Sequence, residues 1–177
     1  FASAADWKRN AAVTRAKSRL AVSLAKRLQT LARQLDDYRA AIEALFAQHP
    51  DHDLFGSLPG AGSKLAPRLM SELGEDRARF GTPQSLQCLA GTAPVSFQSG
   101  QVFRVKMRRC CNPHLRHAVH RWADCSRAGC GWAQAYYQAQ REKGKSHACA
   151  LRCLGHRWLE VLWKMGQDRT TYDGDFH

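Results

Sequence analysis

The sequence predicts a mainly α-helical protein, in which a long coiled-coil helix precedes a compact helical domain with a helix-hairpin-helix and a small β-hairpin. Leucines repeat at heptad spacing through the first fifty residues, and apolar residues recur at helical spacing in the last third. Between these regions one short segment alternates with a period of two, which is typical of a strand. We expect a long helix over residues 1–50, the compact domain over 51–173 and a tail over 174–177.

The first fifty residues carry the heptad pattern. Apolar residues lie alternately four and three positions apart, as at the a and d positions of a coiled coil; they are Leu24, Leu28, Leu31, Leu35, Tyr38, Ile42 and Leu45. The favoured interpretation is a coiled coil, within a dimer or against another helix of the same protein. The alternative is an amphipathic helix that packs on its own domain. The segment HPDHD, residues 49–53, supplies the stop.

The segment LFGSLPGAGSKLAPRLMSELG, residues 54–74, has the pattern of a helix-hairpin-helix. Its glycines allow a tight turn with outward-pointing backbone N–H groups. With the N-terminus of the next helix, these groups can hold a phosphate without reading bases. Gly60, Gly62 and Lys64 are therefore candidate nucleic-acid-binding residues. The alternative is an ordinary corner between two helices.

The segment VSFQSGQVFRVKMRR, residues 95–109, predicts a β-hairpin with Ser99 and Gly100 at or near its turn. After the turn, apolar and basic residues alternate, which gives a strand one apolar and one basic face. The apolar residues are Phe103, Val105 and Met107, and the basic ones are Arg104, Lys106 and Arg108.

Helices should account for most of the remaining domain. We expect them over residues 85–91, 114–125, 132–141 and 147–165. Pro113 suits the first position of the second of these. The apolar stripe of the last helix belongs to the core rather than to a cofactor site; it comprises Leu151, Leu154, Trp158, Leu162 and Met165. The polar segment that starts at Thr170 is expected to be loose.

The charge of the chain favours a polyanionic partner. The net charge is +12 and the isoelectric point is about 9.8, a balance typical of nucleic-acid binding. Residues 77–123 contain no Asp or Glu but eight Lys and Arg. A solvated basic face is the alternative. Mixed signs serve solubility better, however, so an acid-free segment of this length favours an anionic ligand.

Composition also excludes several classes of protein. No apolar run approaches the roughly 18 residues of a membrane span, and the N-terminus lacks the apolar core of an export signal. The seven cysteines lack the paired Cys-x2-Cys spacing of zinc sites. Reduced thiols, as in a cytosolic protein, and no metal on this segment are therefore expected.

Ser99 has two interpretations from the residues alone. Serine followed by glycine is common in turns. A turn would also project the hydroxyl outward beside the basic strand, where arginines such as Arg104 could clamp a phosphate. Phosphoryl transfer needs positioning and cations more than covalent help. Ser96 shares this possibility, although a position within the strand is less exposed.

An ordered set of motifs resembles one family. From about Leu58 to Asp173 they are LPGAG, LMSELGEDRARFGTPQSLQCLAGTAPVSFQSGQ, CNPHLRHAV and LRCLGHRWLEVLWKMGQDRTTYD. This order is similar to the C-terminal domain of bacterial transposases of the Insertion Sequence 110 family. One departure is that the chain has Arg-Arg-Cys-Cys-Asn at 108–112 where the family often has Lys-Arg-Gly-Asn. That change alters the loop shape but not its charge.

The resemblance implies a function. It implies a recombinase guided by a bridge RNA, with a serine nucleophile that falls on Ser99. It also implies DNA as a partner and a dimer or tetramer. An RuvC-like domain with four acidic ligands for Mg²⁺ would lie upstream, so the chain is expected to be a fragment that is inactive alone. The alternative is a non-catalytic helix-hairpin-helix module that binds DNA or RNA.

The candidate site residues follow from both lines of reasoning. Ser99 is the candidate nucleophile, and Gly100 and Arg104 would support it. Nucleic-acid binding is assigned to Gly60, Gly62, Lys64, Lys106, Arg108, Arg109, Asn112, His114 and Arg116.

Overall fold

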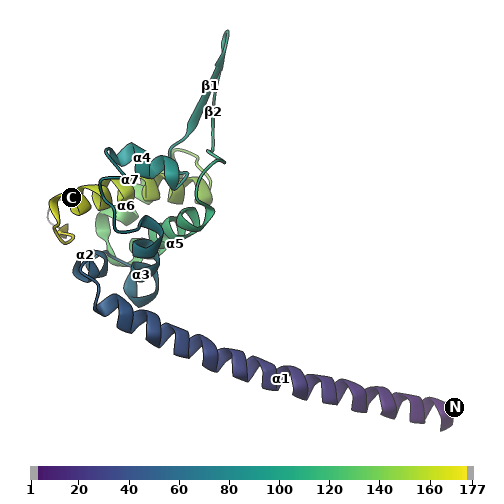
Figure 1. The fold of residues 1–177 in the computed structure, drawn as a ribbon. Coiled ribbons are helices and arrows are strands. Elements are labelled where there is room, and N and C mark those ends of the chain that lie inside the picture. The colour runs from purple at the N-terminus through teal and green to yellow at the C-terminus, as the bar shows by residue number, and fades with distance from the viewer. Residues whose placement is uncertain (1–3, 175–177) are drawn as a thin grey trace. The chain divides into compact units, whose positions relative to one another are not determined.

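The computed structural model describes residues 4–174 (Figure 1). The chain divides into two compact units, Phe1–Ala44 and Leu45–His177. The described residues of the first unit lie within one helix, α1 (Ala4–Ala47). The predicted long helix is therefore confirmed. Its heptad residues are exposed, with exposed fractions between 48% and 71%. Pairing of this heptad face with a second helix stays a prediction.

The second unit contains the helix-hairpin-helix and the β-hairpin. The helix-hairpin-helix consists of α2 (His52–Gly56) and α3 (Gly62–Leu73), which pack on each other. α4 (Pro83–Leu89) leads into strands β1 (Val95–Ser99) and β2 (Val102–Lys106). α5 (Pro113–Gly129), α6 (Gly131–Glu142) and α7 (His147–Asp168) complete the unit. The predicted mainly α fold with one small hairpin is confirmed.

The core surrounds α7, which packs against α4, α5 and α6. All five predicted apolar residues of α7 are buried. The rings of Trp122 in α5 and Trp158 in α7 lie 4.8 Å apart, and the Trp158 indole donates a hydrogen bond to Ser126 Oγ at 2.8 Å. Large aromatic side chains dominate core energetics, and a satisfied indole N–H avoids the cost of an unpaired buried donor.

Local sequence explains where these helices begin. Thr82, Asn112 and Ser146 each accept a backbone N–H at the N-terminus of α4, α5 and α7, respectively. Pro83 and Pro113 occupy the first helical positions, where a missing N–H costs little. The caps therefore set the starting points of the three helices that hold the hairpin and its surroundings.

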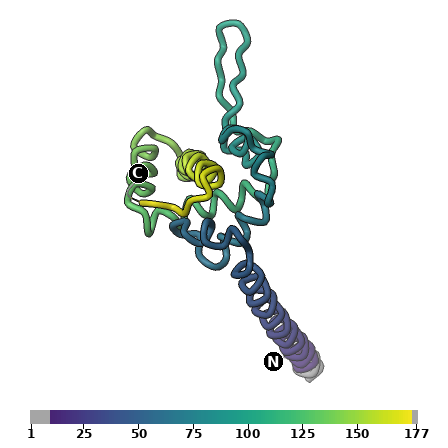
Figure 2. The backbone as a smooth tube through the Cα atoms, turned by 60° about the vertical axis from the view of Figure 1, so that its left-hand side comes forward, coloured from purple at the N-terminus to yellow at the C-terminus, as the bar shows by residue number. Residues whose placement is uncertain are grey.

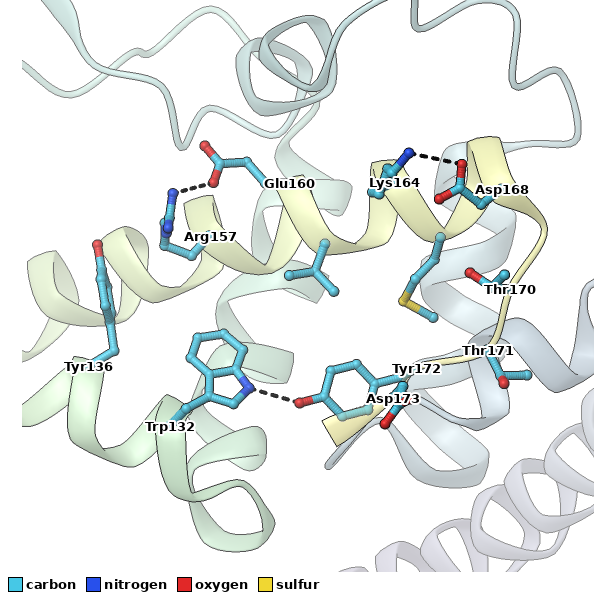
Figure 3. Close-up of a pocket in the computed structure, with 12 residues that line it drawn as sticks. Trp132, Tyr136, Arg157, Glu160, Lys164, Asp168, Thr170, Thr171, Tyr172 and Asp173 are labelled. Carbon is cyan, nitrogen blue, oxygen red and sulfur yellow. Dashed lines mark hydrogen bonds and ion pairs between the residues drawn. The ribbon is translucent and has the colours of Figure 1, made fainter. Parts of the chain in front are cut away.

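The prediction of a loose polar tail is wrong for Tyr172. Its ring packs 5.5 Å from that of Trp158. Its hydroxyl accepts a hydrogen bond from the Trp132 indole at 2.8 Å, and its backbone N–H donates to Ser57 Oγ at 2.8 Å. Figure 3 shows Tyr172 beside Trp132 at the edge of a pocket of about 720 Å³. These three contacts of Tyr172 hold the segment against the core, which its polar neighbours in sequence do not reveal.

Candidate nucleic-acid interface

The β-hairpin places Ser99 at its tip. β1 and β2 pair antiparallel, and Ser99, the last residue of β1, lies opposite Val102. Gly100 and Gln101 form the two-residue turn, and Gly100 has a φ of 54°. Glycine takes this left-handed conformation without steric cost. The hairpin prediction is thus confirmed, with Ser99 immediately before the turn.

The register decides which side chains share a face with Ser99. Opposite residues of an antiparallel pair lie on the same face, and successive residues alternate. Because Phe97 pairs with Arg104 and Val95 with Lys106, these side chains share the face of Ser99. Ser96 lies on the other face. The backbone therefore groups Ser99, rather than Ser96, with Arg104 and Lys106.

The hairpin projects from the helical body of the second unit (Figure 1). Every residue from 96 to 107 is exposed, on both faces. The exposed fractions of Phe97 and Phe103 reach 54% and 63%, and Lys106 Nζ lies 5.2 Å from the Phe97 ring centroid. An exposed apolar patch rimmed by charge is typical of an interaction site. The hairpin thus combines a hydroxyl, two cations and uncovered apolar area.

Other predicted nucleic-acid residues hold the base of the hairpin in place. Arg116 Nη2 donates to the carbonyl oxygens of Arg108 at 2.7 Å and Arg109 at 3.2 Å. The Asn112 side chain caps α5 through the N–H groups of His114 and Leu115 and donates to Glu72 at 3.0 Å. Arg116 and Asn112 therefore bond within the domain. Arg109 and His114 are exposed.

The helix-hairpin-helix lies at the opposite end of the second unit from the hairpin tip (Figures 1 and 2). Gly60, with a φ of 73°, presses on α5: a Cβ there would meet the backbone of Cys125 and Ser126 at 2.6 Å. Gly62, with a φ of 55°, has open space around its Cβ position, and Lys64 is exposed. Gly60 thus serves packing, whereas Gly62 and Lys64 face solvent.

Sequence reasoning missed a cation at the base of the hairpin. Arg152 of α7 donates from Nη1 to Met107 Sδ at 3.1 Å. It lies outside the acid-free segment and 45 residues from Met107 in sequence. No local pattern links the two positions, because the contact depends on where α7 packs relative to the segment after β2. Only the packing of the helices reveals it.

Within the described part of the chain, no three His, Cys, Asp or Glu side chains gather as metal ligands do. The seven cysteines are free thiols. None of the helices described has the length and apolarity that a membrane crossing requires.

Residues 52–138 match a family model described as the transposase IS116/IS110/IS902 family. The chain belongs to this transposase family. The matched residues run from the start of α2 into α6 and include the whole hairpin. Ser99, Arg104 and Lys106 therefore lie inside the part of the chain that defines membership.

Named relatives of this transposase-family chain extend the match. It is 34% identical over 152 residues to a protein of Streptomyces coelicolor named "Mini-circle putative transposase for IS117". The aligned residues cover 86% of this chain and 37% of the relative. It is 33% identical to the insertion element IS900 uncharacterized 42 kDa protein of Mycobacterium paratuberculosis, over 84% of this chain and 38% of that protein. A third relative is the insertion element IS110 uncharacterized 43.6 kDa protein of S. coelicolor, 32% identical over 85% of this chain and 37% of its own length. The chain thus spans less than two-fifths of these relatives.

Proposed function

We propose that this chain is the serine-bearing part of a DNA transposase that acts as a recombinase. Ser99 would attack a DNA phosphodiester and form a phosphoserine intermediate. The observation that carries the proposal is the register, which puts the exposed hydroxyl of Ser99 on one face with Arg104 and Lys106. Membership of a transposase family supports DNA as the substrate.

The reaction follows from this arrangement. Ser99 Oγ forms a bond to phosphorus as its proton passes to a base, and the bond from phosphorus to one deoxyribose oxygen breaks. That oxygen takes up a proton and leaves as a free hydroxyl. Arg104 and Lys106 would neutralise the non-bridging oxygens, on which charge gathers in the transition state. The hydroxyl freed in the same way on another strand can then attack the phosphoserine ester. This step is the reverse of the first: it releases Ser99 and rejoins the DNA, and the energy of the phosphodiester bond is kept in the ester between the two steps.

The base and any metal are assigned to other parts of the full-length protein. Residues 77–123 contain no carboxylate, so the hairpin itself does not fit the Mg²⁺ that the family resemblance implies. No step is therefore drawn through a metal. We also assign the choice of target to pairing with a bridge RNA, and subunit association to the heptad face of α1. The exposed heptad residues support the latter.

A covalent adduct tests the nucleophile. Full-length protein, guide RNA and labelled target DNA are incubated, and denaturing electrophoresis reports DNA that stays bound to protein. Ser99→Ala should abolish the adduct, whereas Ser96→Ala, on the opposite face, should retain it. An adduct that persists in Ser99→Ala would remove Ser99 from the mechanism.

The alternative is a binding module without catalysis. The exposed cations and aromatics of the hairpin favour it equally, because aromatic and basic side chains together bind nucleic-acid strands. In that case Ser99→Ala would change neither binding nor recombination. Arg104→Gln and Lys106→Gln would each flatten the log–log salt dependence of duplex DNA binding by about 0.9.

A further inference from the structure

Four cationic or titratable side chains lie on α5 and α7, which pack on each other, and three of them act electrostatically on the fourth, His120. His117 and His120 belong to α5, and His147 and Arg152 belong to α7. We call them the α5–α7 cluster. Arg152 Nη1 contacts Met107 Sδ at 3.1 Å, so the cluster adjoins the end of β2. His117 and His147 are exposed, and the other two are half-buried.

Charged and titratable neighbours from both helices act on His120, the half-buried histidine of the cluster. Burial lowers the pKa of His120; Arg152 lowers it further, Asp124 opposes this, and His147 and His117 add to the lowering. Asp124 is already paired with Arg127, and the hydrogen bond from Arg127 lowers the pKa of Asp124. The acid that acts on His120 is thus partly neutralised by its own partner.

Two further features orient the cluster towards an anion. His147 is the first residue of α7, whose N-terminal N–H groups carry partial positive charge. The His147 ring is held by the Tyr137 hydroxyl, which lies 2.8 Å from Nδ1. A bound anion would be attracted to the Arg152 guanidinium and would favour the protonated form of His120.

We propose that the α5–α7 cluster binds the DNA phosphate backbone beside the hairpin. The inference rests on the proposed function, because it assumes that the hairpin contacts DNA. It adds a second contact surface that extends from the base of β2 across α5 and α7, and two of its members, His147 and Arg152, lie outside the acid-free segment. The surface would hold the duplex while the tip of the hairpin reaches the reacting phosphate. Phosphates bound here would also oppose the lowering of the His120 pKa, because nearby negative charge favours its protonated form.

Salt dependence of DNA binding tests the cluster directly. Binding of the full chain to a short labelled duplex is measured by fluorescence anisotropy over about 50 to 200 mM KCl. Arg152→Gln should reduce the log–log slope by about 0.9, the loss of one phosphate contact. Lys164→Gln is the matched control. It removes the same charge about 18 Å further along α7, where Lys164 pairs with Asp168, and should leave the slope unchanged.

The histidines give a second, independent readout. Affinity of the wild-type chain should rise as the pH falls from about 8 to about 6, where histidine gains its proton. His117→Gln, at an exposed position, should weaken this rise without loss of fold, which circular dichroism checks. A slope in Arg152→Gln equal to that of Lys164→Gln, or a pH response that His117→Gln leaves intact, would overturn the proposal.

The nucleic acid and the chemistry can be separated in the same way. If Arg152→Gln flattens the salt dependence only for an RNA duplex of equal length, the assignment to DNA is overturned. These measurements need no strand cleavage. A persistent adduct in Ser99→Ala would therefore refute the assignment of Ser99 as the nucleophile, but it would not affect the proposal that the α5–α7 cluster binds DNA. Conversely, an unchanged slope in Arg152→Gln would refute the cluster and leave the adduct assay untouched.

Discussion

Replacement of Gly60 by alanine tests whether this glycine serves packing rather than phosphate binding. Its φ of 73° is left-handed, and its Cβ would lie 2.6 Å from both the carbonyl carbon of Cys125 and the backbone nitrogen of Ser126. These are backbone atoms near the C-terminal end of α5, so no side-chain rotation relieves the contact. Either the turn before α3 must move away from α5 or the helix must shift.

The expected loss of stability has two parts. A non-glycine residue in the left-handed region costs about 1–2 kcal/mol. Overpacking against neighbours that cannot rotate away adds about 1–3 kcal/mol. Gly60→Ala should therefore lower the free energy of unfolding by about 2–5 kcal/mol. Gly62→Ala, with a φ of 55° and open space, should show the conformational cost alone, about 1–2 kcal/mol.

Equilibrium urea unfolding measures both variants. Tryptophan fluorescence is a suitable signal, because Trp122 and Trp158 are buried in the core of the second unit. The variants should share the wild-type m-value, so the midpoints report stability. Equal midpoints for Gly60→Ala and Gly62→Ala would show that the approach of the turn to α5 carries no energetic weight, and would refute the packing interpretation of Gly60.

Three other predictions follow from the same unit. Gly155→Ala should destabilise it by about 1–3 kcal/mol, because the new Cβ would lie 2.8 Å from Val119 Cγ1. Val119→Ala in the same chain should recover part of that loss in a double-mutant cycle by urea unfolding. Asn112→Ala should cost about 0.5–2 kcal/mol through loss of the α5 cap, measured likewise; an unchanged midpoint would contradict the structural role of the cap. Acidification should lower the melting temperature, because burial lowers the pKa of His156 below 6.5 in the fold. The stability this histidine contributes is complete above pH 6.5 and is lost as the pH falls through its folded-state pKa. His156→Gln should therefore show a smaller drop, and an identical drop would exclude His156 as the cause.

The hairpin could be predicted from sequence because its signals are local. A period of two over residues 102–107 and a serine–glycine turn specify two strands and, through the pleat, the face of each side chain. The helix caps at Thr82, Asn112 and Ser146 are local in the same sense. The sequence placed Ser99 and Gly100 only at or near the turn, so the register that groups Ser99 with Arg104 came from the structure.

The roles of Arg116 and Asn112 could not be predicted, because their chemistry is ambiguous. A guanidinium that can grip a phosphate can equally donate to backbone carbonyls, as Arg116 does at the hairpin base. The contacts of Arg152 with Met107 and of Tyr172 with Trp132 join residues at least 40 positions apart. Such contacts depend on helix crossings, which no periodicity along the chain encodes.

The exposed hairpin constrains how the proposed chemistry can work. An isolated two-stranded hairpin is marginally stable in water, and here the strands contact the helical body only at their base. Its apolar face, with Phe103, Val105 and Met107, offers no side chains that bind phosphate. A nucleophile, however, must be held close to its in-line position. We therefore expect a second surface to cover the apolar face while DNA occupies the basic one. Ser99 would then reach its working position only in the assembled complex, which would couple strand attack to assembly.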